Sequence, residues 1–183
     1  MKNIVLISGS PRKNSVSFRI ATHLLKRLEK NEDLKIEFLD MKEFSLPPVQ
    51  KVWMNLEDVP AGYHDLYKTM DHAHGFIIVS PEYNGAYSAT MKNLLDHFAK
   101  PIYKQKAFGI VTGSTGMMGG MRAAQQLVQL SVALFGIVSP TLLVTPQMDK
   151  KFEENGELLD GTFEKPIERF LEDYLWLVER LDK

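Results

Sequence analysis

The sequence predicts an α/β fold in which a parallel β-sheet lies between two layers of helices. Short apolar runs alternate with longer amphipathic segments along the whole 183-residue chain, which is typical of repeated strand–helix units. The apolar runs are continuous rather than alternating, as in strands that are buried on both faces. The length is that of one domain. We therefore expect residues 1–183 to form a single domain that buries its own core.

The N-terminal quarter of the chain contains a clear strand and a clear helix. The run Ile4–Ile7 predicts a buried strand, and residues 15–30 predict a helix because apolar residues recur at helical spacing with charges between them. That apolar stripe comprises Phe18, Ala21, Leu25 and Leu28. Ile36–Leu39 is a weaker strand candidate. Residues 41–62 contain three prolines and are expected to be irregular, either as a binding loop or as a surface excursion without a role.

The alternation continues through the middle of the chain. Tyr63–Ala73 is expected to be a helix, and Phe76–Val79 is a strong strand candidate. Residues 88–98 predict a second amphipathic helix, because their apolar residues form one stripe. A strand at Ala107–Val111 and a helix over residues 123–134 follow.

The C-terminal part completes the sheet and adds a long helix. Ile137–Val138 and Leu142–Val144 offer a fifth strand that is interrupted by Pro140. The last helix has an apolar face made of Ile167, Phe170, Leu171, Tyr174, Leu177, Val178 and Leu181. Five parallel strands predict a flavodoxin-like three-layer sandwich with the strand order 2-1-3-4-5.

The composition excludes several classes of protein. The chain has no cysteine, so disulfide scaffolds, thiolate zinc sites and cysteine nucleophiles are ruled out. Lys and Arg number 22 against 23 Asp and Glu, a balance that gives no support to a nucleic-acid or anionic-membrane partner. The first apolar run is too short for a signal peptide, and no stretch approaches the roughly 20 apolar residues of a membrane span. We expect a cytoplasmic protein. His72 and His74 would point in different directions on a helix, so no metal site is expected.

In a parallel sheet of this order, ligands bind beyond the carboxyl ends of the strands, near the first and third. The loop Ser8–Ser17 leaves the first strand and enters the first helix. Ser10, Ser15 and Ser17 offer hydroxyl groups there, and Arg12 offers a guanidinium group. A helix N-terminus favours anions, and arginine pairs well with phosphate oxygens, so this loop predicts a phosphate site. The alternative is a serine that only caps the helix.

The loop Ser80–Ser88 follows the third strand and combines a bent backbone with flat polar side chains. Pro81 and Gly85 bend the chain. Tyr83, Asn84 and Tyr87 present rings and an amide that suit a flat heterocycle. The alternatives are a solvated turn before a helix capped by Ser88, and a general-base role for Glu82.

The loop Thr112–Met121 follows the fourth strand and contains four glycines within eight residues. Glycine lets a backbone approach a ligand closely because there is no Cβ atom to collide. Ser114 and Thr115 add hydrogen-bond donors. The alternative is a flexible loop, but its place at the same sheet edge as the other two supports a shared ligand site.

Together these segments resemble the NADPH-dependent FMN reductase family, which includes flavodoxin-like flavin, quinone and azo reductases. Gly9–Ser15 reads as the Gly-Ser-x-Arg-x-x-Ser motif, Pro81–Asn84 as Pro-Glu-Tyr-Asn, and Met91–Asp96 as Met-Lys-Asn-x-x-Asp. The glycine-rich segment Gly113–Gly120 is the third feature. The resemblance extends from Lys2 to Leu143. Where the family commonly has Pro-Gly before the Lys-Asn step, this chain has Ser88-Ala89-Thr90.

The resemblance implies an FMN site built from all three loops. Its phosphate would be held by Ser10, Arg12, Ser15 and Ser17. The isoalloxazine ring would be lined by Pro81, Glu82, Tyr83 and Asn84, and its pyrimidine end by Ser114, Thr115, Gly116 and Gly119. Lys92, Asn93 and Asp96 would build the fold or a subunit contact rather than carry chemistry.

The resemblance also implies the reaction. NADPH or NADH would donate a hydride to the flavin, which would reduce a small acceptor (a flavin, quinone or azo compound) in a ping-pong scheme. No catalytic side chain is needed for hydride transfer, because the cofactor carries it. A homodimer or homotetramer is implied as well. Two other classes remain open, namely a flavodoxin-type FMN electron carrier and a non-enzymatic module of the same fold.

Overall fold

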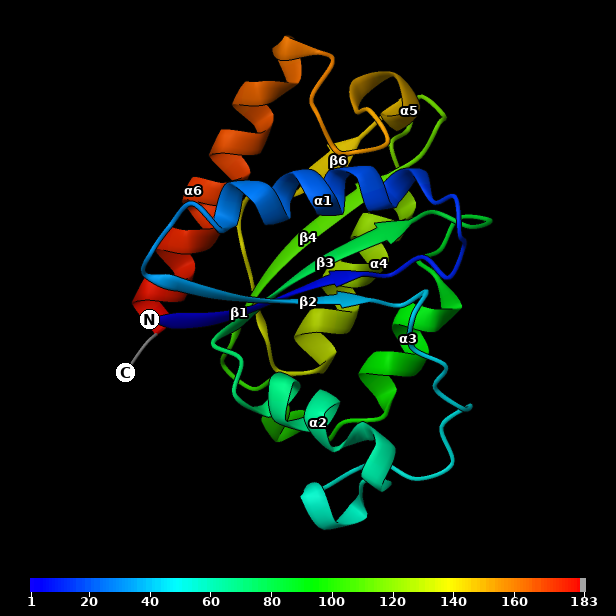
Figure 1. The fold of residues 1–183 in the computed structure, drawn as a ribbon, viewed down its shortest axis with the longest axis vertical. Helices are drawn as coiled ribbons and strands as arrows, with labels where there is room; N and C mark the ends of the chain where they lie inside the picture. The colour runs from blue at the N-terminus through cyan, green and yellow to red at the C-terminus, as the bar shows by residue number, and fades with distance from the viewer. Residues whose placement is uncertain (182–183) are drawn as a thin grey trace.

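The computed structural model describes residues 1–181 and shows one parallel sheet between two layers of helices (Figure 1). The strand order is β2-β1-β3-β4-β5, with β6 also paired to β4. All of these pairings are parallel. The strands are β1 (Lys2–Ser8), β2 (Leu34–Asp40), β3 (Gly75–Pro81), β4 (Ala107–Gly113), β5 (Ile137–Val138) and β6 (Leu143–Thr145). The predicted order 2-1-3-4-5 and the flavodoxin-like architecture are confirmed.

The fifth position of the sheet is divided into two short strands, so the sheet has six strands rather than the predicted five. β5 pairs with the first residues of β4 and β6 with its last residues. The amide of Ser139 still donates to the carbonyl of Phe108 at 2.8 Å. Pro140 comes next and has no N–H to continue the ladder. The predicted interruption therefore lies where the sequence places the proline.

The helices divide between the two faces of the sheet (Figure 1). α1 (Val16–Leu28), α5 (Met148–Lys151) and α6 (Glu164–Leu181) pack on one face. α2 (His64–Asp71), α3 (Ala89–Asp96) and α4 (Met121–Ala133) pack on the other. Short 3-10 turns lie at Leu56–Asp58, Ala61–Tyr63, Lys100–Ile102 and Gly161–Phe163. None of the helices within residues 1–181 combines the length and apolar character that a membrane span requires.

The continuous apolar runs are explained by the two cores. In β1, Val5 and Ile7 belong to one buried cluster, whereas Ile4 and Leu6 belong to the other. Successive side chains of a strand point to opposite faces of the sheet. The strand residues from Ile4 to Ser8 in β1, and all those of β3 and β4, are therefore buried, whereas Lys2 and Asn3 at the start of β1 are half-buried.

The apolar stripe predicted for α1 is partly wrong. The structure buries Ile20, Ala21, Leu24 and Leu28, whereas Phe18 and Leu25 are only half-buried. Phe18 lies at the flank of the helix, where its ring centroid is 6.0 Å from that of Phe38. Six of the seven residues predicted for the apolar face of α6 are buried, namely Ile167, Phe170, Leu171, Tyr174, Leu177 and Val178. The seventh, Leu181, is half-buried and packs against the same core.

The segment 41–62 is irregular, as predicted, but hydrogen bonds from Asn93 attach it to α3. Its side-chain amide donates to the carbonyls of Leu46 (3.3 Å) and Pro47 (2.9 Å), and its oxygen accepts from the amide of Val49 at 3.2 Å. Trp53 is 4% exposed and its amide donates to the carbonyl of His97 at 2.7 Å. The expected structural role of Asn93 is thus explained by its contacts.

Candidate functional site

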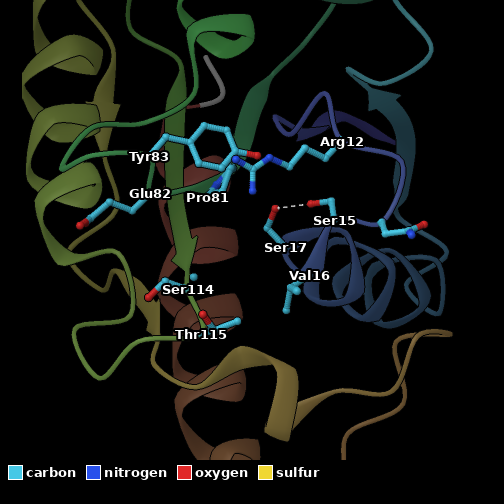
Figure 2. Close-up of a pocket in the computed structure, with 11 residues that line it drawn as sticks. Arg12, Ser15, Val16, Ser17, Pro81, Glu82, Tyr83, Ser114 and Thr115 are labelled. Carbon is cyan, nitrogen blue, oxygen red and sulfur yellow. Dashed lines mark hydrogen bonds between the residues drawn. The ribbon is translucent and has the colours of Figure 1, made fainter.

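The loops after β1, β3 and β4 meet at the carboxyl edge of the sheet, as the sequence predicts. The register places Ser8 beside Val79 and Pro81 beside Gly113. The amide of Gly9 donates to the carbonyl of Val79 at 2.8 Å, which joins the first two loops. A pocket opens between the three loops (Figure 2), and we call it the edge pocket. It is lined by Arg12, Asn14, Ser15, Val16, Ser17, Pro81, Glu82, Tyr83, Gly113, Ser114 and Thr115.

The N-terminus of α1 faces the edge pocket without a side-chain cap. Ser15 occupies the N-cap position, but its hydroxyl makes no capping hydrogen bond. Instead its Oγ lies 2.9 Å from the Oγ of Ser17, the contact drawn as a dashed line in Figure 2. Amide groups in the first turn of a helix have no partner within the helix. Together with the two hydroxyls they form a cluster of donors suited to an anion.

The first loop contacts the second through Ser10, Arg12 and Tyr83. The guanidinium carbon of Arg12 lies 4.2 Å from the ring centroid of Tyr83, a cation–π contact. The hydroxyl groups of Tyr83 and Ser10 are 3.0 Å apart, and Ser10 is 1% exposed. The guanidinium group of Arg12 therefore lies over the ring of Tyr83 at the edge pocket (Figure 2).

The second loop contains a tight two-residue turn. The amide of Tyr83 donates to the carbonyl of Ala86 at 2.8 Å, and the amide of Ala86 returns a bond of 3.1 Å. Asn84 and Gly85 adopt φ values of 52° and 84°, as the two central positions of a type I′ turn require. Asn84 is exposed at the tip of this turn and is not part of the pocket lining.

The start of α3 takes the place of the Pro-Gly step that is common in the family. Ser88 caps this helix, since its Oγ accepts from the amide of Met91 at 3.2 Å. The hydroxyls of Ser88 and Thr90 both donate to the carbonyl of Gly9. The serine and threonine thus hold the first loop against α3 through hydrogen bonds.

Glu82 bridges the second loop and α4. Its Oε2 accepts from the amides of Arg122 (3.1 Å) and Ala123 (3.2 Å), in the first turn of α4. The N-cap residue of that helix is Gly120, which has no side chain to do this. The Glu82 side chain is only 13% exposed, and in Figure 2 it turns away from Arg12 and Ser17. Its carboxylate therefore acts as the cap of α4.

Two glycines of the third loop, Gly113 and Gly119, lie against other parts of the protein. A Cβ atom on Gly113 would lie 1.6 Å from Cε of Met148, and one on Gly119 would lie 2.6 Å from the nitrogen of Pro146. Gly119 also has a φ of +58°. These glycines let the loop pack against the chain after β6. Gly116 is exposed and its carbonyl accepts from the amide of Gln147 at 3.2 Å.

The edge pocket brings together most of the residues chosen from the sequence, namely Arg12, Ser15, Ser17, Pro81, Glu82, Tyr83, Ser114 and Thr115. Ser10 joins it through Tyr83. Asn84, Gly116 and Gly119 do not line it. Sequence reasoning missed three lining residues: Asn14, Val16 and Gly113. Asn14 and Val16 flank Ser15 at the helix N-terminus, so their position in the loop was the signal that could have found them.

The fold and the edge pocket define a class of protein: a flavodoxin-like α/β protein with a pocket suited to an anion at the switch point of its sheet. The sequence profile described as "NADPH-dependent FMN reductase" matches residues 2–149. This chain belongs to that family of NAD(P)H-dependent FMN reductases, and it is an enzyme of the oxidoreductase class.

Similar proteins agree with this assignment. The chain is 28% identical over 185 residues to a Staphylococcus aureus protein named FMN-dependent NADPH-azoreductase, covering 97% of this chain and 95% of that one. The fold of the present chain resembles that of FerB, a flavoenzyme NAD(P)H:(acceptor) oxidoreductase from Paracoccus denitrificans, with a TM-score of 0.83, 21% identity and 98% coverage of each chain. The apo form of an NADH:FMN oxidoreductase, EMOB, gives a TM-score of 0.71 at 16% identity, covering 100% of this chain and 91% of that one.

Proposed function

We propose that this enzyme binds FMN in the edge pocket and uses it to pass electrons from NAD(P)H to a small acceptor. The observation that carries the proposal is the N-terminus of α1, which has no side-chain cap and lines the pocket with Ser15, Val16 and Ser17. Because the family is one of FMN reductases, a phosphate monoester is the anion that this cluster of donors would hold.

The phosphate end would lie against the first loop. Ser15 and Ser17 supply hydroxyl donors there, and the first-turn amides of α1 supply backbone donors. Arg12 supplies a charged planar donor, which forms shorter and stronger hydrogen bonds to phosphate than neutral groups do. Ser10 is buried and bonded to Tyr83, so its proposed role is to position that ring and the amide of Arg12, which donates to its Oγ at 3.3 Å.

The ring end would lie between the second and third loops. Pro81 and Tyr83 offer apolar surface on one side, and Ser114 and Thr115 offer donors on the other. Glu82 would hold the two loops at a fixed spacing by capping α4. Asn84, Gly116 and Gly119 would contribute by shaping the two loops, given their positions in the turn and against the chain after β6.

FMN, when bound, supplies the redox chemistry by taking a hydride from NAD(P)H and passing two electrons to an acceptor. The net reaction consumes NAD(P)H, a proton and the acceptor, and it yields NAD(P)⁺ and the acceptor with two added hydrogens. The side chains of the edge pocket bind and orient, and none is assigned as acid or base. The name of the Staphylococcus aureus relative supports NADPH as the reductant and azo compounds as one class of acceptor. Flavins and quinones are the other acceptors proposed.

The enzyme is also proposed to form a homodimer or homotetramer. Apolar side chains are exposed on α4 and on the two ends of that helix: Met117, Met118, Met121, Val132 and Phe135. Arg122 is the one charged residue in the sequence of α4, so two copies could approach this face without strong repulsion between like charges. Sedimentation velocity tests the oligomer, and a monomer at micromolar concentration would contradict it.

FMN titration of the apoprotein, followed by fluorescence quenching, tests the binding site. Arg12→Ala is expected to weaken FMN binding about tenfold, the effect of losing roughly 1.4 kcal/mol of a charge-assisted contact. Arg180→Ala is the matched control, because Arg180 is exposed at the far end of α6. Equal FMN affinity in both variants would remove Arg12 from the site.

Steady-state kinetics with a well-behaved quinone test the reaction scheme. A ping-pong mechanism gives parallel double-reciprocal lines when NADPH is varied at several acceptor concentrations. Converging lines would indicate that both substrates are bound together and would contradict the proposal.

A further inference from the structure

A small pocket of about 160 Å³ lies at the amino end of the sheet, at the opposite end of the strands from the edge pocket (Figure 1). Two of its residues precede β3, two precede β4, and two belong to α6. The lining residues are Ala73, His74, Gln105, Lys106, Val178 and Leu181. We call it the Lys106 pocket, and the proposed function gives it no role.

The amine of Lys106 is half-buried at this pocket and has few partners. Its Nζ donates to the carbonyl of Asp71, the last residue of α2, at 2.8 Å. The same atom lies 5.7 Å from the ring centroid of Phe76. An ammonium group has three N–H donors, but within residues 1–181 Lys106 makes no ion pair and no second hydrogen bond. The charged form of the side chain is therefore poorly compensated.

The surroundings of Lys106 favour its uncharged form. Burial lowers the pKa of Lys106 from its usual 10.5 to about 8, against the opposing charge of Asp71. His74 lines the same pocket, and its pKa is lowered by burial and then by the charges of Lys2, Lys106 and the N-terminal amine. At pH 7.5 about a quarter of Lys106 is then uncharged, against about 0.1% of a lysine with the usual pKa. The uncharged amine is the form that has a lone pair for nucleophilic attack.

We propose that Lys106 is an acylation site, where the Nζ atom attacks an activated acyl group that enters the Lys106 pocket. Ala73, Val178 and Leu181 give the pocket an apolar wall for a short acyl chain. Acylation removes the charge of a lysine, and an uncharged amide suits a half-buried position better than an ammonium group does. The site does not depend on bound flavin, so the inference goes beyond the proposed function.

The reaction needs neither an oxidant nor a reductant. A bond forms between Nζ and the acyl carbon, and the bond from that carbon to its leaving group breaks. The amine releases one proton as the amide forms. With an acyl phosphate as the donor, the leaving group is inorganic phosphate.

Acetylation of the purified protein by acetyl phosphate at pH 7.5, followed at each lysine by peptide mass spectrometry, tests the proposal. Lys104 is the internal control, because it is exposed and lies two positions away in the same segment. The large uncharged fraction of Lys106 is partly offset because nucleophilicity falls with basicity, as it does for thiols. Lys106 is expected to be acetylated about tenfold faster than Lys104. Equal rates, or a faster reaction at Lys104, would overturn the proposal.

The pH dependence of the same reaction separates the effect of the fold from that of the local sequence. In the folded protein the acetylation rate at Lys106 should level off above about pH 8, where most of the amine is uncharged. In protein unfolded with concentrated urea, the rate at Lys106 should continue to rise to about pH 10. The same pH profile in both states would overturn the proposal.

Asp71→Asn tests the charge next to the amine. The substitution keeps the backbone carbonyl but removes the carboxylate that opposes loss of the proton from Lys106. The acetylation rate at Lys106 is expected to rise about twofold at pH 7.5. Asp65→Asn is the matched control, because it makes the same change on a fully exposed side chain of the same helix. Equal rates at Lys106 in the two variants would overturn the proposal.

Discussion

Exchanging Glu82 for alanine and for glutamine separates a structural role of this carboxylate from a chemical one. In the structure its Oε2 accepts hydrogen bonds from the first-turn amides of Arg122 and Ala123. Glu82→Ala removes both bonds and leaves α4 with a glycine at its N-cap. Glu82→Gln keeps a side-chain oxygen that can accept the same bonds, but it removes the negative charge.

The expected losses follow from the contacts. Loss of an N-cap acceptor costs about 0.5–2 kcal/mol, and loss of a negative charge at a helix N-terminus costs about 0.3–1 kcal/mol. Glu82→Ala should therefore destabilise the protein by about 1–2 kcal/mol, which lowers Tm by about 5 °C in a chain of this size. Glu82→Gln should lose about 0.5 kcal/mol, since only the charge contribution is removed.

Urea unfolding of the apoproteins measures these differences. Glu172→Ala is the matched control, because Glu172 is exposed on α6 and loses the same atoms. Anaerobic flavin reduction by NADPH is the second assay, in which Glu82→Gln should retain a rate close to that of the wild type. A general acid or base contributes roughly 10²–10⁴-fold to a rate. A loss of that size in Glu82→Gln, or equal destabilisation by both substitutions, would refute the capping role.

Three further substitutions test individual contacts of the fold. Asn93→Ala removes the three hydrogen bonds to residues 46–49 and should cost about 1–2 kcal/mol; trypsin should then cleave faster after Lys51, and an unchanged rate would contradict the tie. Gly119→Ala places a side chain at φ +58° and 2.6 Å from the backbone nitrogen of Pro146. The resulting strain should destabilise the fold by about 1–3 kcal/mol and lower Tm, and an unchanged Tm would contradict the close approach. Asp160 has a pKa lowered to about 2, chiefly by the hydrogen bond from Lys151. Its ionised form therefore stabilises the fold above about pH 4, and this contribution is lost as pH falls toward 2. Acid titration of stability should show the advantage of the wild type over Asp160→Asn disappearing across that interval, and a difference that stays constant to pH 2 would argue against the pair.

The strands and their order could be predicted because a central strand that is buried on both faces has a continuous apolar sequence, as in Ile4–Ile7. The loops could be predicted because parallel strands bring their carboxyl ends to one edge. The interruption of the last strand was also visible, since Pro140 cannot donate to the ladder.

The remaining features depend on contacts between distant segments, which a sequence pattern does not encode. Glu82 caps a helix that begins about 40 positions later. Gly119 is a glycine because of Pro146, and Asn84 occupies a turn whose type is visible only in its backbone angles. The stripe on α1 was misjudged because Phe18 and Leu25 are apolar but lie at the flank of the buried face.

The most direct test of the central claim is the absorbance spectrum of the purified protein with added FMN, recorded before and after anaerobic addition of NADPH. We predict a spectrum characteristic of bound flavin that bleaches when NADPH is added. Flavin that binds but stays oxidised with both NADPH and NADH would indicate an electron carrier, and a protein that does not bind FMN would contradict the account.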